Sequence, residues 1–124
     1  MERMKNLLAW FEIPVLDMSR AKTFYETVLD IEITTVEFGG FKMGWFPRPE
    51  EGAAGSLVQH EAYKPSTEGS LIYFASDDLA LPLSRVEQAG GKVLQEKTQI
   101  SEDHGYMAVF TDTEGNRIAL HSMS

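Results

Sequence analysis

The chain has 124 residues, no cysteine, and a formal net charge of −8 from 19 acidic and 11 basic side chains. The lack of cysteine excludes disulfides, thiolate metal ligands and a cysteine nucleophile, and an acidic chain with scattered basic residues argues against a nucleic-acid partner. No apolar run is long enough to cross a bilayer and the polar N-terminus lacks a signal-peptide core, so we expect a cytoplasmic protein with a small-molecule ligand and no membrane partner.

The first half of the chain predicts the order strand, helix, strand, strand, strand. An apolar strand at 8–15 is interrupted by Pro14, and Asp17 or Ser19 can cap the helix that follows. One face of that helix carries an apolar stripe at helical spacing: Ala21, Phe24, Tyr25, Val28 and Leu29. Three further strands are expected at 32–38, 41–46 and 56–60.

The second half predicts the same order after a polar linker at 63–69, which contains Pro and Gly and has no apolar period. A strand is expected at 70–75, then a helix that Asp77 or Asp78 caps and that a pair of glycines at 90–91 terminates. The remaining strands are expected at 92–95, 106–110 and 117–121.

Constant offsets between the halves indicate a duplicated unit. Asp17 and Asp78 are 61 positions apart, and so are His60 and His121. Together with the matching element order, this spacing predicts two βαβββ units, at 1–62 and 70–124, that form one domain of the α+β class.

Three motifs resemble the vicinal oxygen chelate superfamily, the group of glyoxalases, bleomycin-resistance proteins and extradiol dioxygenases. Pro-Val-Leu-Asp-Met-Ser-Arg-Ala-Lys-Thr-Phe-Tyr at 14–25 resembles its first-unit signature, and Arg-Val-Glu-Gln-Ala-Gly-Gly-Lys-Val at 85–93 resembles its second helix. Asp-Thr-Glu-Gly-Asn-Arg-Ile-Ala-Leu at 112–120 resembles its closing hairpin. The resemblance implies a curved mixed sheet around a concave cavity, helices outside, and a homodimer.

In enzymes of this superfamily a divalent metal in the cavity chelates two oxygens of the substrate, with ligands on the first and last strand of each unit. The resemblance places these ligand positions at Trp10, Val58, Leu71 and Ala119. An indole nitrogen only donates hydrogen bonds, and the other three side chains carry no donor atom. We therefore expect no metal at the usual positions and no other cofactor.

Alternation along the strands predicts a different set of pocket residues. Side chains two positions apart share a face, so Glu12 joins Trp10, Tyr73 joins Leu71, and the two histidines join Val58 and Ala119. The pocket residues predicted in this way are Trp10, Glu12, His60, Tyr73 and His121. Glu12, His60 and His121 together offer an alternative metal site with open coordination positions, or general acid and base groups.

Other polar or soft side chains receive structural interpretations. Met43 and Met107 are interpreted as core residues. Asp103 and His104 are interpreted as a solvated turn, and the acidic pairs Glu50–Glu51 and Asp112/Glu114 as loop residues that face water.

Three functions are compatible with these patterns. The first is a glyoxalase-like protein that binds a small, partly apolar molecule without the usual metal. The second is a metal-dependent lyase, isomerase or dioxygenase with displaced ligands, and the third is a protein that sequesters a drug or metabolite. No catalytic residue is assigned from the sequence, and the ligand is not identified by it.

Overall fold

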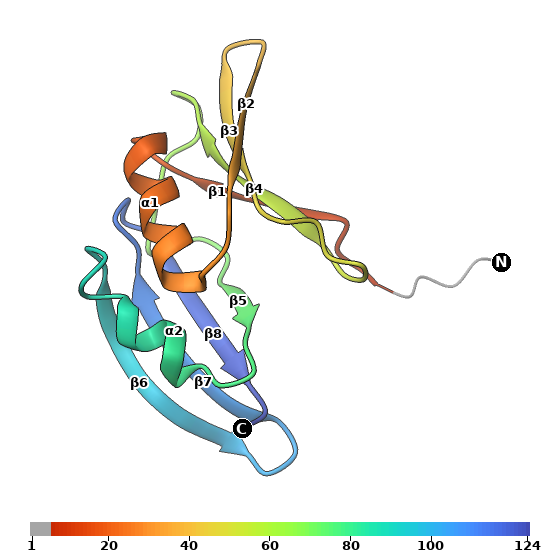
Figure 1. The fold of residues 1–124 in the computed structure, drawn as a ribbon, viewed down its shortest axis with the longest axis vertical. Coiled ribbons are helices and arrows are strands. Elements are labelled where there is room, and N and C mark those ends of the chain that lie inside the picture. Colours follow the sequence, from red (N-terminus) through yellow and green to blue (C-terminus); the bar gives the residue numbers. More distant parts are fainter. Residues whose placement is uncertain (1–5) are drawn as a thin grey trace, which may run out of the picture.

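The computed structural model describes residues 6–124, so residues 1–5 of the predicted first unit lie outside the described part. The fold is α+β and consists of two βαβββ units, which confirms the predicted fold class (Figure 1). The first unit contains β1 (Trp10–Pro14), α1 (Met18–Leu29), β2 (Thr34–Phe38), β3 (Phe41–Trp45) and β4 (Ala54–Gln59). The second contains β5 (Ile72–Ala75), α2 (Ala80–Arg85), β6 (Lys92–Ser101), β7 (Gly105–Thr111) and β8 (Arg117–Ser122).

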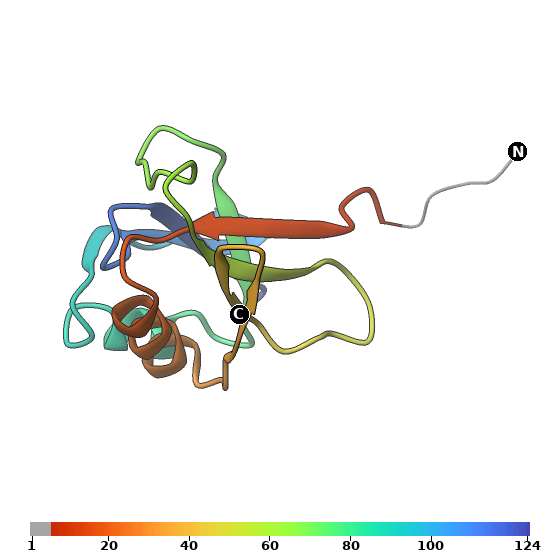
Figure 2. The same cartoon turned by 90° about the horizontal axis from the view of Figure 1, so that it is seen from above.

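The two sheets have the same topology. The first has the strand order β1-β4-β3-β2 and the second the order β5-β8-β7-β6. In each sheet the first strand of the unit pairs in parallel with the last, and the other pairs are antiparallel. Both helices lie on the same side of the strands in Figure 2.

Helix α1 forms where the apolar stripe predicts it. The carboxylate of Asp17 accepts a hydrogen bond from the backbone N–H of Arg20, which is the interaction of a helix N-cap. The helix ends at Leu29, and the C-cap residue Asp30 has a left-handed backbone conformation. Four members of the predicted stripe are buried, namely Ala21, Phe24, Tyr25 and Val28.

Helix α1 also joins the two units, because its buried face contacts both. The ring of Phe24 lies 5.9 Å from that of Phe110 in β7, and the ring of Tyr25 lies 5.7 Å from that of Phe46 beyond β3. Residues of both units therefore belong to a single hydrophobic cluster.

The close approach of α1 to the first sheet depends on Gly44 in β3. A Cβ atom at this position would lie only 2.9 Å from the sulfur of Met18 and 3.0 Å from the side chain of Ile33. Because side chains alternate along a strand, Trp45 points to the opposite face, which α1 does not cover. We call the faces turned away from the helices the uncovered faces.

Several predicted elements differ in extent. Strand β6 runs from Lys92 to Ser101, although only 92–95 was expected, because shifts in its register with β7 break the apolar period that marks a strand. Helix α2 has only six residues, and both predicted ends were wrong. Its N-cap is Leu79, which forms no side-chain capping bond, and it ends at Arg85, before the glycines at 90–91. The carboxylate of Asp78 still accepts a hydrogen bond from the backbone N–H of Ala80. Met43 and Met107 are partly exposed on strands, so their assignment to the core was wrong.

The interpretation of Asp112 and Glu114 as solvated loop residues was also wrong, since each is only 5% exposed. The carboxylate of Asp112 accepts hydrogen bonds from the backbone N–H groups of Glu114 and Asn116, at 2.8 and 2.9 Å. Its other oxygen accepts from the Tyr25 hydroxyl at 2.5 Å and from the Asn116 side-chain amide at 3.0 Å. Asp112 thus connects the hairpin of β7 and β8 to the centre of α1.

Glu114 connects the same hairpin to the start of α1. Its carboxylate accepts from the backbone N–H groups of Leu16 and Asp17, at 2.7 and 2.9 Å, and from two nitrogens of Arg20, at 2.7 and 3.0 Å. An anion is favoured at this place because the first N–H groups of a helix have no partner within the helix. We call the set of Tyr25, Asp112, Glu114, Asn116 and Arg20 the hairpin clasp.

Neither helix in residues 6–124 is long and apolar enough to span a bilayer.

Candidate functional site

A cleft of about 1000 Å³ lies between the two units. It is bounded by β1, the start of β4 and the loop before it, β5, the end of α1 and one face of α2. Three phenylalanines of its lining, Phe11, Phe46 and Phe74, contact one another with ring centroids 5.4–5.8 Å apart. These rings come from both units, so the apolar surface of the cleft forms only when the units are joined.

Trp10 and Glu12 bring polar groups to the edge of this cleft from β1. The indole N–H of Trp10 donates to the Glu12 carboxylate at 3.3 Å, and the hydroxyl of Tyr63 donates to the other oxygen at 3.0 Å. The bond to Glu12 raises the pKa of the Tyr63 hydroxyl above its usual value. Tyr63 was assigned to the linker, and its contact with residue 12 could not be seen from the sequence.

Tyr73 lines the cleft from β5 and is 50% exposed. It occupies the position in the second unit that Glu12 occupies in the first, 61 residues earlier. Of the five predicted pocket residues, the structure therefore brings three, Trp10, Glu12 and Tyr73, into one cleft.

His60 lies just after β4 and does not line this cleft. Its ring stacks on Phe41 with the centroids 4.1 Å apart, and its Nδ1 accepts from the backbone N–H of Ala62 at 3.1 Å. Its position is thus set by contacts at the end of the first sheet.

His121 lies in β8, away from His60 and outside the cleft. Its Nε2 is 2.6 Å from the backbone oxygen of His104. Because a carbonyl oxygen only accepts, Nε2 carries the proton in this bond. Among residues 6–124 no three His, Asp or Glu side chains are grouped in a way that could hold a metal ion, so Glu12, His60 and His121 do not meet within one chain.

The four positions that correspond to the usual metal ligands do not fit a metal. Val58 and Ala119 are buried and apolar, with 1% and 0% exposure. Leu71 and Trp10 line the cleft, but the first has no donor atom and the second offers only a hydrogen-bond donor. No chemical step through a metal at these positions follows from this chain.

The sequence did not reveal two polar side chains near these surfaces, Ser56 and Arg85. Ser56 pairs with Glu12 and Trp45 on its neighbouring strands, and its buried hydroxyl has no hydrogen-bond partner among the described residues. The Nε atom of Arg85, which lines the cleft from α2, is also buried without a hydrogen-bond partner among the described residues. No local pattern in the sequence marks either atom, because the lack of a hydrogen-bond partner becomes visible only in the folded chain.

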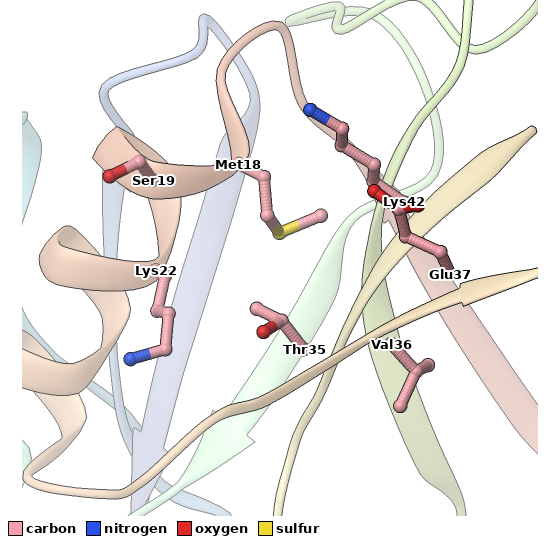
Figure 3. A pocket seen from close by; sticks show the side chains of 7 residues that line it. All are labelled: Met18, Ser19, Lys22, Thr35, Val36, Glu37 and Lys42. Carbon is pink, nitrogen blue, oxygen red and sulfur yellow. The ribbon is translucent and has the colours of Figure 1, made fainter.

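A second hollow of about 460 Å³ lies between the start of α1 and the hairpin of β2 and β3 (Figure 3). Met18 extends into it from the helix, while Thr35 and Val36 border it from β2. Lys22 on its border is held by Glu26 at 3.1 Å. It is smaller than the cleft between the units, and none of the described residues that line it is aromatic, so we regard the cleft as the main candidate site.

Solved structures share this fold. An antibiotic-binding protein from Streptomyces sp. CB03234, TnmS3, is 23% identical with a TM-score of 0.72, over 94% of this chain and 95% of that chain. UcmS2 is 25% identical with a TM-score of 0.71, over 98% of this chain and all of that one. A glyoxalase I variant from Zea mays is 16% identical with a TM-score of 0.70, and the match covers 98% of this chain but 48% of that chain.

A search of curated proteins gives no match to this sequence. The family model of the Glyoxalase/Bleomycin resistance protein/Dioxygenase superfamily, however, matches residues 7–120. This match spans both repeated units and agrees with the fold and with the motifs at 14–25, 85–93 and 112–120. The chain therefore belongs to the Glyoxalase/Bleomycin resistance protein/Dioxygenase superfamily.

Proposed function

We propose that this protein binds a small, partly apolar organic molecule in the cleft between its units, without a divalent metal at the usual strand positions. The cleft of about 1000 Å³ carries this proposal. Its volume and its mainly apolar and aromatic lining with a few polar groups are typical of small-molecule sites.

The residues that line the cleft support a role in sequestering a drug or metabolite. Among residues 6–124 no histidine lines it, and Glu12 already accepts hydrogen bonds from Trp10 and Tyr63. TnmS3, which has the same fold, is an antibiotic-binding protein. The alternative metal-dependent enzyme needs Glu12, His60 and His121 close together, and these residues belong to separate places in the chain described here.

Ligand binding in the cleft predicts that Trp10→Ala and Tyr73→Ala each weaken binding about tenfold, because each removes a large apolar contact surface. A thermal-shift screen of apolar compounds identifies the ligand, and calorimetric titration then measures the affinity of each variant. The control is Phe38→Ala, which removes a similarly exposed aromatic residue that does not line the cleft.

Two results would contradict this proposal. One is equal loss of affinity in Phe38→Ala, which would show that the cleft is not the binding site. The other is a rise in the melting temperature of the unliganded protein on addition of stoichiometric Zn²⁺ or Ni²⁺, when both His60→Ala and His121→Ala abolish that rise. The second result would support the displaced metal site.

We also propose that two copies form a homodimer through their uncovered faces. Trp45 is 39% exposed there, and Leu94 and Ile100 of the second sheet are 49% and 50% exposed. Because the two sheets have the same strand order, a two-fold axis can place the first sheet of each copy against the second sheet of the other.

Light scattering after size exclusion is expected to give twice the chain mass of 13.9 kDa for the native protein. Trp45→Glu should give the mass of one chain, because it adds a charge to a desolvated contact. Leu81→Glu is the control, since Leu81 is exposed on α2 and outside the uncovered faces. A native protein with the mass of one chain at 100 μM would rule out the dimer.

A further inference from the structure

Arg85 is a cation in the wall of the cleft that forms no ion pair with any of the described residues 6–124. It is the last residue of α2, and its Nε is buried without a hydrogen-bond partner among the described residues. The ion pairs within residues 6–124 belong to Arg20, Lys22 and Lys97. Arg20, which forms two bonds to Glu114, shows how the same side chain is paired where its role is structural.

An interaction with the end of α2 does not account for this arrangement. A cation near a helix C-terminus is favourable, but the effect is small and is available to a side chain that extends into water. Burial of a guanidinium N–H without an acceptor costs free energy in the unliganded protein. Such a cost is understandable when the acceptor belongs to a ligand.

The surroundings of Arg85 define the chemistry of that acceptor. It is the single cationic side chain among the described residues that line the cleft, and the two acidic ones are Glu12 and Glu51. Glu12 is bonded to Trp10 and Tyr63, and neither acid forms an ion pair with Arg85. The lining that the end of α1 and β5 contribute to the same cleft is mainly apolar.

We propose that Arg85 binds a single carboxylate of the ligand, whose apolar or aromatic body lies against the phenylalanines of the cleft; this assignment rests on the proposed function. A carboxylate matches the planar guanidinium, which can donate two parallel hydrogen bonds to it. A phosphate is disfavoured because one cation and two acids line the cleft, in a chain of net charge −8. Its second negative charge would have no partner.

The test uses acids and their neutral amides with the same body: 1-naphthaleneacetate, 4-biphenylacetate and indole-3-acetate, each against its acetamide. Calorimetric titration of the native protein should show that at least one acid binds roughly ten- to a hundredfold more tightly than its amide, as expected for a charge-assisted pair of hydrogen bonds. Arg85→Met should abolish this preference and leave the amide affinity within about threefold, because the apolar contacts remain.

Two variants control for charge and shape. Arg48→Gln removes the same charge from the exposed loop beside the cleft but no lining side chain, so the preference for the acid should persist. Arg85→Lys keeps the charge without the planar fork and should give an intermediate preference. The melting temperature of unliganded Arg85→Met should stay within about 3 °C of the native value, since no ion pair of Arg85 with the described part of the chain is lost.

Four outcomes would overturn the assignment. Equal affinity for acids and amides would reject the role of Arg85 while the proposed function stands. If Arg48→Gln abolished the preference for acids as fully as Arg85→Met does, the preference would be a long-range effect of charge. If 1-naphthyl phosphate bound more tightly than every acid, and Arg85→Met abolished this binding, the ligand group at Arg85 would be a phosphate and not a carboxylate. Failure of every acid and amide to bind would reject the assignment, and the proposed function would fail with it only if the thermal-shift screen of apolar compounds also gave no ligand.

Discussion

Replacing Asp112 with alanine is expected to lower the free energy of unfolding by about 3–5 kcal/mol. Four donors lose their acceptor at once, among them the hydroxyl of Tyr25, which is fully buried. Burial, followed by the charge of Asp112, raises the pKa of this hydroxyl well above its usual value, so it remains a donor at neutral pH. Since domains of this kind are typically stable by about 5–15 kcal/mol, the variant should be close to unfolding at physiological temperature.

Urea denaturation followed by tryptophan fluorescence measures this loss. Asp103→Ala is the matched control, because Asp103 is exposed in the turn between β6 and β7, and it should change stability by less than about 0.5 kcal/mol. Tyr25→Phe should cost about 1–2 kcal/mol in the native background and close to nothing in Asp112→Ala, where the hydroxyl has already lost its acceptor. An equal cost of Tyr25→Phe in both backgrounds would show that this bond does not stabilise the clasp.

Glu114→Gln is expected to lower the free energy of unfolding by about 2–4 kcal/mol at pH 7 and to flatten its dependence on pH. The native carboxylate is surrounded by donors from Leu16, Asp17, Arg20 and Thr113. A glutamine amide presents one acceptor and one donor to the same groups, so its NH₂ faces other N–H groups. The loss therefore exceeds that of one hydrogen bond.

The direction of the pH effect follows from the pKa of Glu114. Burial alone would raise this pKa, but the hydrogen bonds from Arg20, from the N–H of Asp17 and from their neighbours outweigh burial, and the pKa lies below its usual value. A carboxyl with a lower pKa in the folded state stabilises the protein above its pKa in the unfolded chain, and this contribution is lost as the pH falls through the folded pKa. The native protein should accordingly lose stability below about pH 5.

Unfolding free energies measured by urea titration from pH 3 to 7 test this expectation. The difference between native protein and Glu114→Gln should be largest at pH 7 and should shrink toward pH 3. Glu102→Gln is the control, because Glu102 is exposed in the turn after β6 and should leave the pH profile unchanged. A constant difference between native protein and Glu114→Gln across this range would mean that the charge of Glu114 is not what stabilises the clasp.

The candidate site could be predicted only in part, for a reason that particular residues illustrate. Trp10, Glu12 and Tyr73 were found because each lies on a strand whose alternation is local, and the repeat relates the two strands. His60 and His121 were placed with them by the same alternation, yet they lie outside the cleft because strand position does not determine which part of a face a cavity occupies. Arg85 was missed because its exceptional property is the lack of a partner, which only the surrounding structure reveals.

Local patterns in the sequence were sufficient for the strand and helix order, the cap at Asp17, the buried stripe of α1 and the duplication, because each depends on residues within a few positions of one another. The cleft and the clasp depend on contacts between residues far apart in the chain. Glu114 meets Leu16 across 98 positions. Two acids that resemble a solvated turn become buried acceptors, Glu114 at the start of α1 and Asp112 at its centre. Only tertiary packing brings these donors and acceptors together, so the carboxylates, Arg85 and the volume between the units acquire their roles in the folded protein alone.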